Sequence, residues 1–357
     1  MHRYARQLNL PEMSLLKQEH LSNVSILMVG AGGLGSPALP ALAGAGIGHI
    51  VIADHDSVDI TNLHRQTIYR EDQAGALKAE LAKDYLQNLN PEVNIEALSQ
   101  KITNENIEGL LESYQFSLIL DGSDNFETKV LLNEYAISTK TPLLSASILR
   151  FGGQIGLFAG YLVDKPCYRC LFPNLPKDAY DCNQAGVLGT ASGMAGMLQA
   201  HIALCYLLDL GTYELGDIFI MELDNLRLEK VRLSKNKSCE TCKNSNHSTM
   251  SNLESHQTMI DILPIEEIAK KDAIIVDVRE PNEVESDPLE HELITRPPLQ
   301  IPLTQIPMKI SQLPTHKPLA FICAGNIRSH NAAEYVAARG YENVFVLDKF
   351  SLAPQKA

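Results

Sequence analysis

The sequence predicts an α/β protein with two domains, the first doubly wound around a parallel sheet. Apolar runs typical of buried strands alternate with helical stretches along the first 147 residues. Residues 244–258 are rich in Ser, Asn and His and have no apolar period, which is typical of a linker. Strand and helix patterns resume beyond it. We therefore expect a larger domain over 1–243, a linker over 244–258 and a smaller α/β domain over 259–357.

The composition argues against several classes of protein. The 357 residues carry 30 Lys and Arg against 43 Asp and Glu, a net charge of −13 with no long basic run, so we expect no nucleic-acid or membrane partner. The uncharged stretch 186–208 is long enough to cross a bilayer, but its polar and small residues favour a buried helix. Seven cysteines and no signal-peptide pattern predict a cytoplasmic protein whose cysteines bind metal or act as nucleophiles.

The elements follow in order from the patterns. Residues 24–54 predict a strand, a glycine-rich loop, a helix and a second strand. Further strands are expected at 93–98, 116–121 and 142–147, with helices near 78–88, 104–113 and 125–139. In the second domain, strands are expected at 274–278, 319–323 and 344–347, with a helix over 329–339.

A nucleotide site is expected at the first strand end. The run GAGGLG at residues 30–35 fits G-x-G-x-x-G between a strand and a helix, as in a Rossmann-like domain. Its glycines let backbone approach a phosphate, and Asp54 at the end of the next strand could bind ribose hydroxyls. These features alone fit NAD as well as ATP, and a glycine turn that binds nothing is the alternative.

The following polar residues distinguish ATP from NAD. Asn62, Arg65 and Gln66 come just after the ribose carboxylate, and Lys78 follows a short loop later. Two cations near a phosphate site suit a triphosphate that gains charge during attack, and Asp124 in DGSDN could hold Mg²⁺. Hydride transfer needs none of these groups, so the set favours ATP over a NAD-dependent oxidoreductase.

Five motifs carry a family resemblance. In this order, RYARQ, GAGGLG, DHDSVDITNLHRQ, GALKAE and DGSDN resemble the MoeB/ThiF/HesA adenylyltransferases, relatives of ubiquitin-activating enzymes, over residues 3–243. That family adenylates the C-terminal Gly-Gly carboxylate of a ubiquitin-like sulfur carrier and releases pyrophosphate. The resemblance implies catalytic roles for Arg65 and Lys78 at the α-phosphate and for Asp124 as the Mg²⁺ ligand.

The resemblance also implies the nucleotide contacts and a homodimer. Arg6, in RYARQ, would reach the triphosphate bound by the partner subunit. The implied cofactor-binding residues are Arg6, Gly30, Gly32, Gly33, Gly35, Asp54, Thr61, Asn62, Leu63, His64, Arg65, Gln66, Lys78, Asp124 and Asn125.

Two C-x-x-C pairs, Cys167 with Cys170 and Cys239 with Cys242, predict a metal site. Four thiolates brought together bind zinc tetrahedrally with no open position, which makes the ion structural. A redox pair is the competing interpretation for either motif alone. The resembled family has pairs at these two places, which favours Zn²⁺.

Three further cysteines receive different interpretations. Cys182 lies in a proline-rich segment where thioester- or acyl-disulfide-forming relatives carry a cysteine, so it is a candidate acyl acceptor, although some relatives do not need it. Cys205 lies in an apolar helical run and is expected to pack in the core. Cys323 ends an apolar strand, and the loop after it leads into a helix.

The loop after Cys323 is a candidate sulfur-transfer site. Its backbone N–H groups, the helix N-terminus and Arg328 all favour a negative sulfur. The C-x₄-R-S loop and VDVREPNE resemble the rhodanese active site, whereas phosphatase loops have one residue more. A buried inert cysteine is the alternative. Residues 284–300 depart from the rhodanese pattern, since the usual Gly-His-Ile-Pro-Gly run is replaced.

Together the motifs resemble fused adenylyltransferase–sulfurtransferase proteins that use ATP, Mg²⁺ and Zn²⁺. We expect adenylation of a Gly-Gly-ended sulfur carrier, a persulfide on Cys323 supplied by a cysteine desulfurase, and a thiocarboxylate product. Molybdopterin synthesis, thiamin synthesis and tRNA thiolation all fit this chemistry. The alternatives are an adenylyltransferase whose degenerate rhodanese-like domain only binds partners, and a non-catalytic dimeric scaffold.

Overall fold

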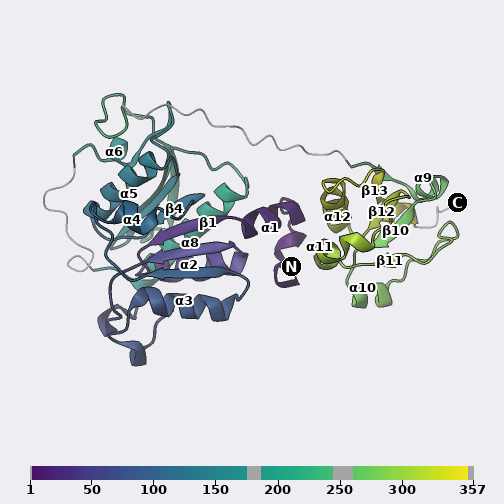
Figure 1. Cartoon of the computed structure of the whole chain (residues 1–357), viewed down its shortest axis with the longest axis horizontal. Helices are drawn as coiled ribbons and strands as arrows, with labels where there is room; N and C mark the ends of the chain where they lie inside the picture. The colour runs from purple at the N-terminus through teal and green to yellow at the C-terminus, as the bar shows by residue number, and fades with distance from the viewer. Residues whose placement is uncertain (1, 175–185, 244–259, 353–357) are drawn as a thin grey trace. The chain divides into compact units, whose positions relative to one another are not determined.

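The chain forms two compact units. The computed structural model describes residues 2–174, 186–243 and 260–352 (Figure 1). One unit is His20–Asn252, and the second combines Met1–Glu19 with Leu253–Ala357. Both are α/β, as the sequence predicts. The expected linker, 244–258, lies outside the described residues, so its boundaries stay predictions.

The first unit is built on an eight-stranded sheet in the order β3-β2-β1-β4-β5-β6-β7-β8. The first five strands are parallel, and the last three join antiparallel. The strands are β1 Ser25–Val29, β2 His49–Ala53, β3 Asn94–Leu98, β4 Leu118–Asp121, β5 Leu143–Leu149, β6 Gly152–Phe158, β7 Asp217–Glu222 and β8 Arg227–Arg232. The five parallel strands, β1 to β5, lie where the sequence predicted strands, so these predictions are confirmed. The sequence patterns did not predict β6, β7 and β8.

Helices cover this sheet because its central strands are apolar on both faces. The helices of this unit are α2 Gly35–Ala45, α3 Lys78–Leu89, α4 Ile107–Leu111, α5 Phe126–Ser138, α6 Tyr168–Leu171 and α8 Gly189–Leu207. Helix α1, Leu15–Ser22, spans the boundary between the two units. On one face, Leu132 and Tyr135 of α5 pack with Leu27, Val51 and Ile119 of the strands.

Helix α8 is the uncharged stretch that is long enough to cross a bilayer. It packs against α2, and at Gly196 an added Cβ would lie 2.2 Å from the carbonyl oxygen of Leu34. The small residues therefore permit close packing inside the unit. Across the described parts of the chain, no helix is both long and apolar enough to cross a membrane.

The second unit has a five-stranded, all-parallel sheet in the order β11-β10-β12-β13-β9. Its elements are β9 Ile262–Leu263, α9 Ile265–Lys270, β10 Ile274–Asp277, α10 Pro281–Ser286, β11 Leu299–Gln300, α11 Ile306–Lys309, β12 Leu319–Ile322, α12 Ile327–Ala337 and β13 Val344–Leu347. The expected strands and helix are confirmed, with α12 beginning two residues earlier than expected. Cys323 comes directly after β12.

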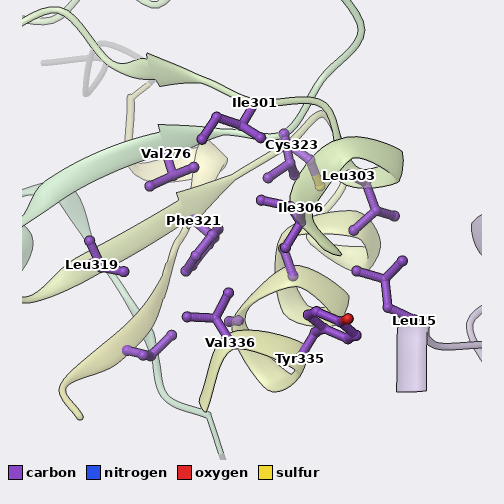
Figure 2. Packing of buried hydrophobic residues seen from close by; sticks show 14 of the residues in the cluster. Leu15, Val276, Ile301, Leu303, Ile306, Leu319, Phe321, Cys323, Tyr335 and Val336 are labelled. Carbon is purple, nitrogen blue, oxygen red and sulfur yellow. The ribbon is translucent and has the colours of Figure 1, made fainter. Parts of the chain in front are cut away.

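The N-terminal segment is part of this second unit. Leu8 and Leu15 are fully buried in its core, in the cluster that contains Phe321 and Tyr335. Figure 2 shows Leu15 in this cluster. Asn331 of α12 donates hydrogen bonds to the carbonyl oxygens of Leu8 and Met13, at 3.4 and 2.9 Å. The sequence patterns did not predict this packing, because it joins residues more than three hundred positions apart.

We predict that Leu8→Ala lowers the free energy of unfolding of the second unit by about 2–5 kcal/mol, because it leaves a cavity in that core. Leu10 is 51% exposed, so Leu10→Ala is the matched control and should cost less than about 0.5 kcal/mol. The measurement is urea unfolding of the full chain with hydrogen exchange read at α12. Equal protection of α12 in the two variants would contradict the packing.

Candidate functional site

A cavity of about 870 Å³ lies at the carboxyl ends of β1, β2 and β4, where Val29, Ala53 and Gly122 line it. The chain runs from β1 outward to β2 and β3, then returns to β4 on the other side of β1. This reversal leaves an opening between the loops after β1 and β4, the usual ligand position in doubly wound sheets. The cavity is therefore where the fold predicts a nucleotide.

The glycine-rich loop forms one wall. Gly30 has a φ of +91°, a left-handed conformation that disfavours side chains, and an added Cβ would lie 2.9 Å from the carbonyl oxygen of Gly122. A Cβ on Gly35 would lie 2.0 Å from the carbonyl oxygen of Gly30. Gly30, Gly32 and Gly33 line the cavity, while Gly35 opens α2 behind them.

Asp54 follows β2 and is held rigidly. Its Oδ2 accepts a hydrogen bond from the backbone N–H of Ala31 at 2.7 Å, and its Oδ1 accepts one from the N–H of Asp56 at 2.8 Å. Burial raises the pKa of Asp54, while these hydrogen bonds and the charge of Lys78 oppose the rise. Each carboxylate oxygen keeps a lone pair, so Asp54 can still accept from ribose hydroxyls.

Two of the predicted cations line the same cavity. Lys78, at the start of α3, is nearly buried, and its Nζ lies 3.1 Å from Asp56 Oδ2. The Arg65 guanidinium donates to Asn62 Oδ1. Arg65, Asn62 and Gln66 all line the cavity. These groups can provide positive charge and hydrogen-bond donors to phosphates.

The rest of the predicted loop is arranged differently. Thr61 donates its hydroxyl to Asp59 Oδ1 at 2.6 Å, and His64 Nδ1 lies 3.0 Å from the carbonyl oxygen of Thr61. Thr61, Leu63 and His64 are not among the residues that line the cavity. The contacts of Thr61 and His64 stabilise the loop that presents Arg65, and a direct nucleotide contact of the three residues stays a prediction.

Asp124 and Asn125 line the opposite wall, after β4. Asn125 is the N-cap of α5, where its side-chain oxygen accepts the N–H of Thr128 at 2.8 Å. Asp124 is exposed beside it, so its carboxylate is available to a cation that accompanies the nucleotide phosphates. The structure thus brings both predicted residues to the cavity.

The sequence patterns missed a buried polar network below this wall. Asp121 ends β4 with its side chain fully buried, and Lys129 of α5 donates to Asp121 Oδ2 at 2.9 Å. Ser145 of β5 also donates to that oxygen, and Gln199 of α8 donates to the Asp121 carbonyl oxygen at 2.9 Å. Lys129 also lines the cavity. The spacing D-x₂-D-N-x₃-K, which places Lys129 one turn into α5, is the available sequence signal.

The four motif cysteines form one cluster. All four side chains are buried, and their sulfurs lie within 4.8 Å of one another. The Sγ–Sγ distances are 3.9 Å for Cys167–Cys170, 3.7 Å for Cys167–Cys239 and 3.6 Å for Cys170–Cys242. A zinc ion with Zn–S bonds of about 2.3 Å in tetrahedral geometry places sulfurs about 3.8 Å apart. The cluster therefore has the dimensions of a structural zinc site.

The electrostatics of the cluster favour a cation. The hydrogen bond with Cys170 and burial raise the pKa of Cys167, while the same pairing lowers that of Cys170. Neighbouring thiolates repel one another, so the four cannot all ionise in this buried position without positive charge. A divalent ion would remove that repulsion.

Cys323 occupies the base of its loop and is 1% exposed. Its Sγ accepts a hydrogen bond from the Ser329 N–H at 3.4 Å and lies 3.3 Å from the Ser329 hydroxyl. The N-terminus of α12 therefore faces the sulfur, as expected. Arg328, predicted to stabilise that sulfur, forms hydrogen bonds with Glu283 and also interacts electrostatically with Cys323.

Three predicted residues remain, namely Cys182, Arg6 and Cys205. Cys182 lies outside the described residues. Arg6 is exposed in the N-terminal segment of the second unit. Cys205 is buried in α8, as expected for a packing residue, with its Sγ 3.6 Å from His201 Nε2.

The fold and cavity define the first unit as a nucleotide-binding α/β domain with a cationic phosphate side and a cysteine cluster. The chain belongs to the ThiF family, whose model matches residues 4–241. The model of the rhodanese-like domain matches residues 265–351. The adenylyltransferase-type and rhodanese-like parts that the motifs suggested are thereby confirmed.

Similar proteins carry names that agree with this family assignment. A "Sulfur carrier protein adenylyltransferase" of Thermus thermophilus is 38% identical over 245 residues, covering 67% of this chain and 90% of that protein. An "Adenylyltransferase and sulfurtransferase MOCS3" of Culex quinquefasciatus is 43% identical over 200 residues, covering 56% of this chain. That match spans about half of the relative, 45% of its length.

Among solved structures, E. coli MccB with MccA-N7isoASN has a TM-score of 0.60 and 21% identity. The match covers 68% of this chain and 74% of that one, and it supports the fold.

We predict that Lys129→Met destabilises the first unit by about 3–5 kcal/mol, because it leaves the Asp121 carboxylate buried without a counter-charge. Lys101 is an exposed lysine beside the same cavity, so Lys101→Met is the control, with an expected change within about 0.5 kcal/mol. Urea unfolding without nucleotide measures both. Equal stability of the two variants would show that the pair does not anchor the sheet.

Proposed function

We propose that the protein adenylates the C-terminal glycine of a ubiquitin-like sulfur-carrier protein and then transfers sulfur to it. The observation that supports the first step is the cavity that joins the glycine-rich loop, Asp54 and the cations Arg65 and Lys78. The rhodanese-like match over 265–351 supports the second step. The relative named sulfur carrier protein adenylyltransferase supports the substrate class.

Adenylation joins a carboxylate oxygen of the carrier to the α-phosphorus of ATP and releases pyrophosphate. A C-terminal carboxyl has a pKa of about 3.3–3.7, so it is already an anion at neutral pH and needs no general base. The demands on the protein are positioning and charge stabilisation. Asp54 would orient the ribose, Asn62 and Gln66 would bind the nucleotide, and Arg65 and Lys78 would stabilise negative charge on the α-phosphate.

Lys78 is held ready for this role. Its pairing with Asp56 keeps the ammonium at the cavity wall before a phosphate arrives. Asp124 would bind the Mg²⁺ that neutralises the outgoing pyrophosphate. Arg6 would act in a homodimer, on the triphosphate held by the partner subunit.

Sulfur transfer would use Cys323 as a persulfide. Its terminal sulfur attacks the carrier's acyl carbon, AMP leaves, and an acyl disulfide forms. A thiol reductant then cleaves the S–S bond, giving the carrier thiocarboxylate and the Cys323 thiol. Cys182 could take the acyl group as a thioester before this attack. A cysteine desulfurase would supply the sulfur.

The thiol chemistry suits a reducing, cytoplasmic setting, since the described cysteines are free of disulfides. The Cys167, Cys170, Cys239 and Cys242 cluster would hold Zn²⁺ and tie the end of the domain to its middle.

We predict that Arg65→Ala lowers ATP–pyrophosphate exchange, measured with a Gly-Gly-ended carrier and Mg²⁺, by about 100- to 1,000-fold, because the α-phosphate loses a cation. Arg70 is an exposed arginine paired with Asp72, so Arg70→Ala is the control and should retain exchange. Exchange that survives Arg65→Ala at the control rate would favour a scaffold over an enzyme.

Zinc binding is predicted to depend on the cluster alone. Cys239→Ser should lose the bound metal, about one zinc ion per chain, and lower the melting temperature. Cys205→Ala, which changes a buried cysteine outside the cluster, should keep the zinc. Metal analysis of both purified variants, with thermal unfolding before and after chelation, gives the answer. A wild-type chain without zinc would contradict the assignment.

A further inference from the structure

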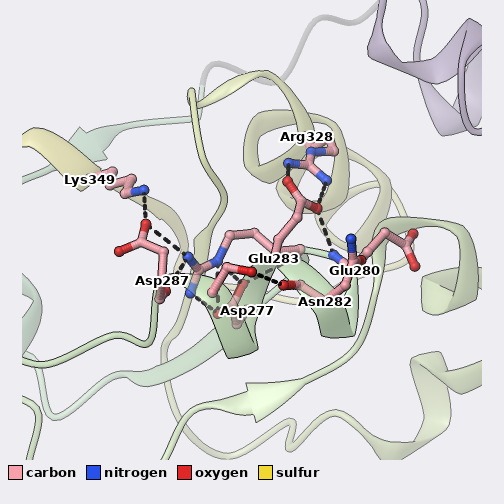
Figure 3. Close-up of polar contacts among 9 residues, drawn as sticks. Asp277, Glu280, Asn282, Glu283, Asp287, Arg328 and Lys349 are labelled. Carbon is pink, nitrogen blue, oxygen red and sulfur yellow. Dashed lines mark hydrogen bonds and ion pairs between the residues drawn. The ribbon is translucent and has the colours of Figure 1, made fainter.

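The loop of Cys323 is bordered by a carboxylate that the proposed function does not use. Glu283 lies in α10, and its Oε2 accepts the N–H of Glu280 at 2.9 Å, which holds the side chain in place. Arg328 Nη1 donates to Glu283 Oε2 and Nη2 donates to Oε1, both at 2.6 Å. Figure 3 shows the two planar groups facing each other.

This pairing neutralises the cation of the loop. Both Nη atoms of Arg328 are directed at one carboxylate, a bidentate geometry that is among the stronger ion pairs. The hydrogen bonds from Arg328 lower the pKa of Glu283 to about 2, so Glu283 stays charged at any physiological pH. The positive charge expected beside the sulfur is therefore offset by a neighbouring carboxylate, although it still acts on Cys323.

Two other cations of this unit, Arg279 and Lys349, are also paired with carboxylates. Arg279 is buried against Asp277, with Nη2 donating to Oδ2 at 2.7 Å. Lys349 lies 2.6 Å from Asp287, which is also within 3.5 Å of Arg279. A small dianion such as thiosulfate would therefore meet matched charges beside Cys323 and would have to displace a carboxylate to gain a cation.

The rim of the loop has a different character. Ala324 and Gly325 are exposed, and the side chain of Ile327 is 40% exposed, so the exposed residues of the loop are small or apolar. Cys323 itself is 1% exposed, so its surroundings must move before a donor can reach the sulfur. Contact with a protein surface can provide the binding energy for that movement, whereas a small ion makes too few contacts.

We propose that Glu283 is a specificity-determining residue that selects a protein-borne persulfide over a small anionic sulfur donor. This inference rests on the proposed sulfur transfer at Cys323. With a protein persulfide, the Cys323 thiolate attacks the outer sulfur, the donor's S–S bond breaks, and the donor leaves as a thiolate. With thiosulfate, the same attack would release sulfite. Both reactions leave a persulfide on Cys323.

The test compares two donors on the full-length chain. Thiosulfate:cyanide sulfurtransferase kinetics measure the small anion, and ³⁵S transfer from cysteine through a cysteine desulfurase measures the protein donor. Wild type should label from the desulfurase, Cys323→Ala should not, and wild-type turnover of thiosulfate should be slow. Glu283→Gln should raise kcat/KM for thiosulfate at least about tenfold, mainly through a lower KM, because Arg328 is freed to bind the anion.

Two controls isolate the charge. Glu285→Gln makes the same change on the exposed side of α10 and should leave the thiosulfate kinetics at the wild-type value. Glu283→Asp keeps the charge and should also keep thiosulfate turnover slow. A Glu283→Gln rate no higher than that of Glu285→Gln, in a chain that labels from the desulfurase, overturns the inference alone. If Cys323 accepts sulfur from neither donor, the result contradicts both the proposed sulfur transfer and the inference that rests on it.

Discussion

The first unit depends on one buried carboxylate, that of Asp121 at the end of β4. A charge in this position is tolerated only when donors surround it. Lys129 from α5 and Ser145 from β5 donate to this carboxylate, and Gln199 from α8 donates to the Asp121 carbonyl oxygen, so the residue holds three elements against β4. Ser123 donates its N–H to the same carboxylate and so shapes the start of the loop that carries Asp124. The polar network that stabilises the sheet also reaches the cavity, which Lys129 and Ser123 line.

On the other side of the cavity, the polar side chains are also held in place by hydrogen bonds. The two oxygens of Asp54 are each bound by a backbone N–H, so the carboxylate is oriented before any ribose arrives. Asp56 fixes the ammonium of Lys78, and Asn62 fixes the guanidinium of Arg65. An anionic nucleophile needs oriented charge more than it needs a proton acceptor, and oriented charge is what these contacts provide.

The two sulfur centres differ in the charge around them, although both are buried. Four thiols crowd together at the cysteine cluster, and they can all ionise only if a cation joins them. Cys323 is a single thiol that faces a helix N-terminus and the Ser329 hydroxyl. Its nearby arginine is bound by Glu283, which keeps the loop close to neutral. The first arrangement suits a structural ion, and the second suits a sulfur that is exchanged between proteins.

The parallel strands, the glycine-rich loop and the cysteine pairs could be predicted from the amino-acid sequence, because each depends on a short run of residues with its own period or spacing. It also located Asp54, Asn62, Arg65 and Lys78, which follow strand ends and so meet at one edge of the sheet. Three features became visible only in the folded chain: β6 to β8 extend this sheet antiparallel, Leu8 completes the core of the second unit, and Glu283 binds Arg328. These contacts join side chains far apart in the chain, and the physical reason they stay hidden is that pairing and burial depend on the folded neighbours rather than on local pattern.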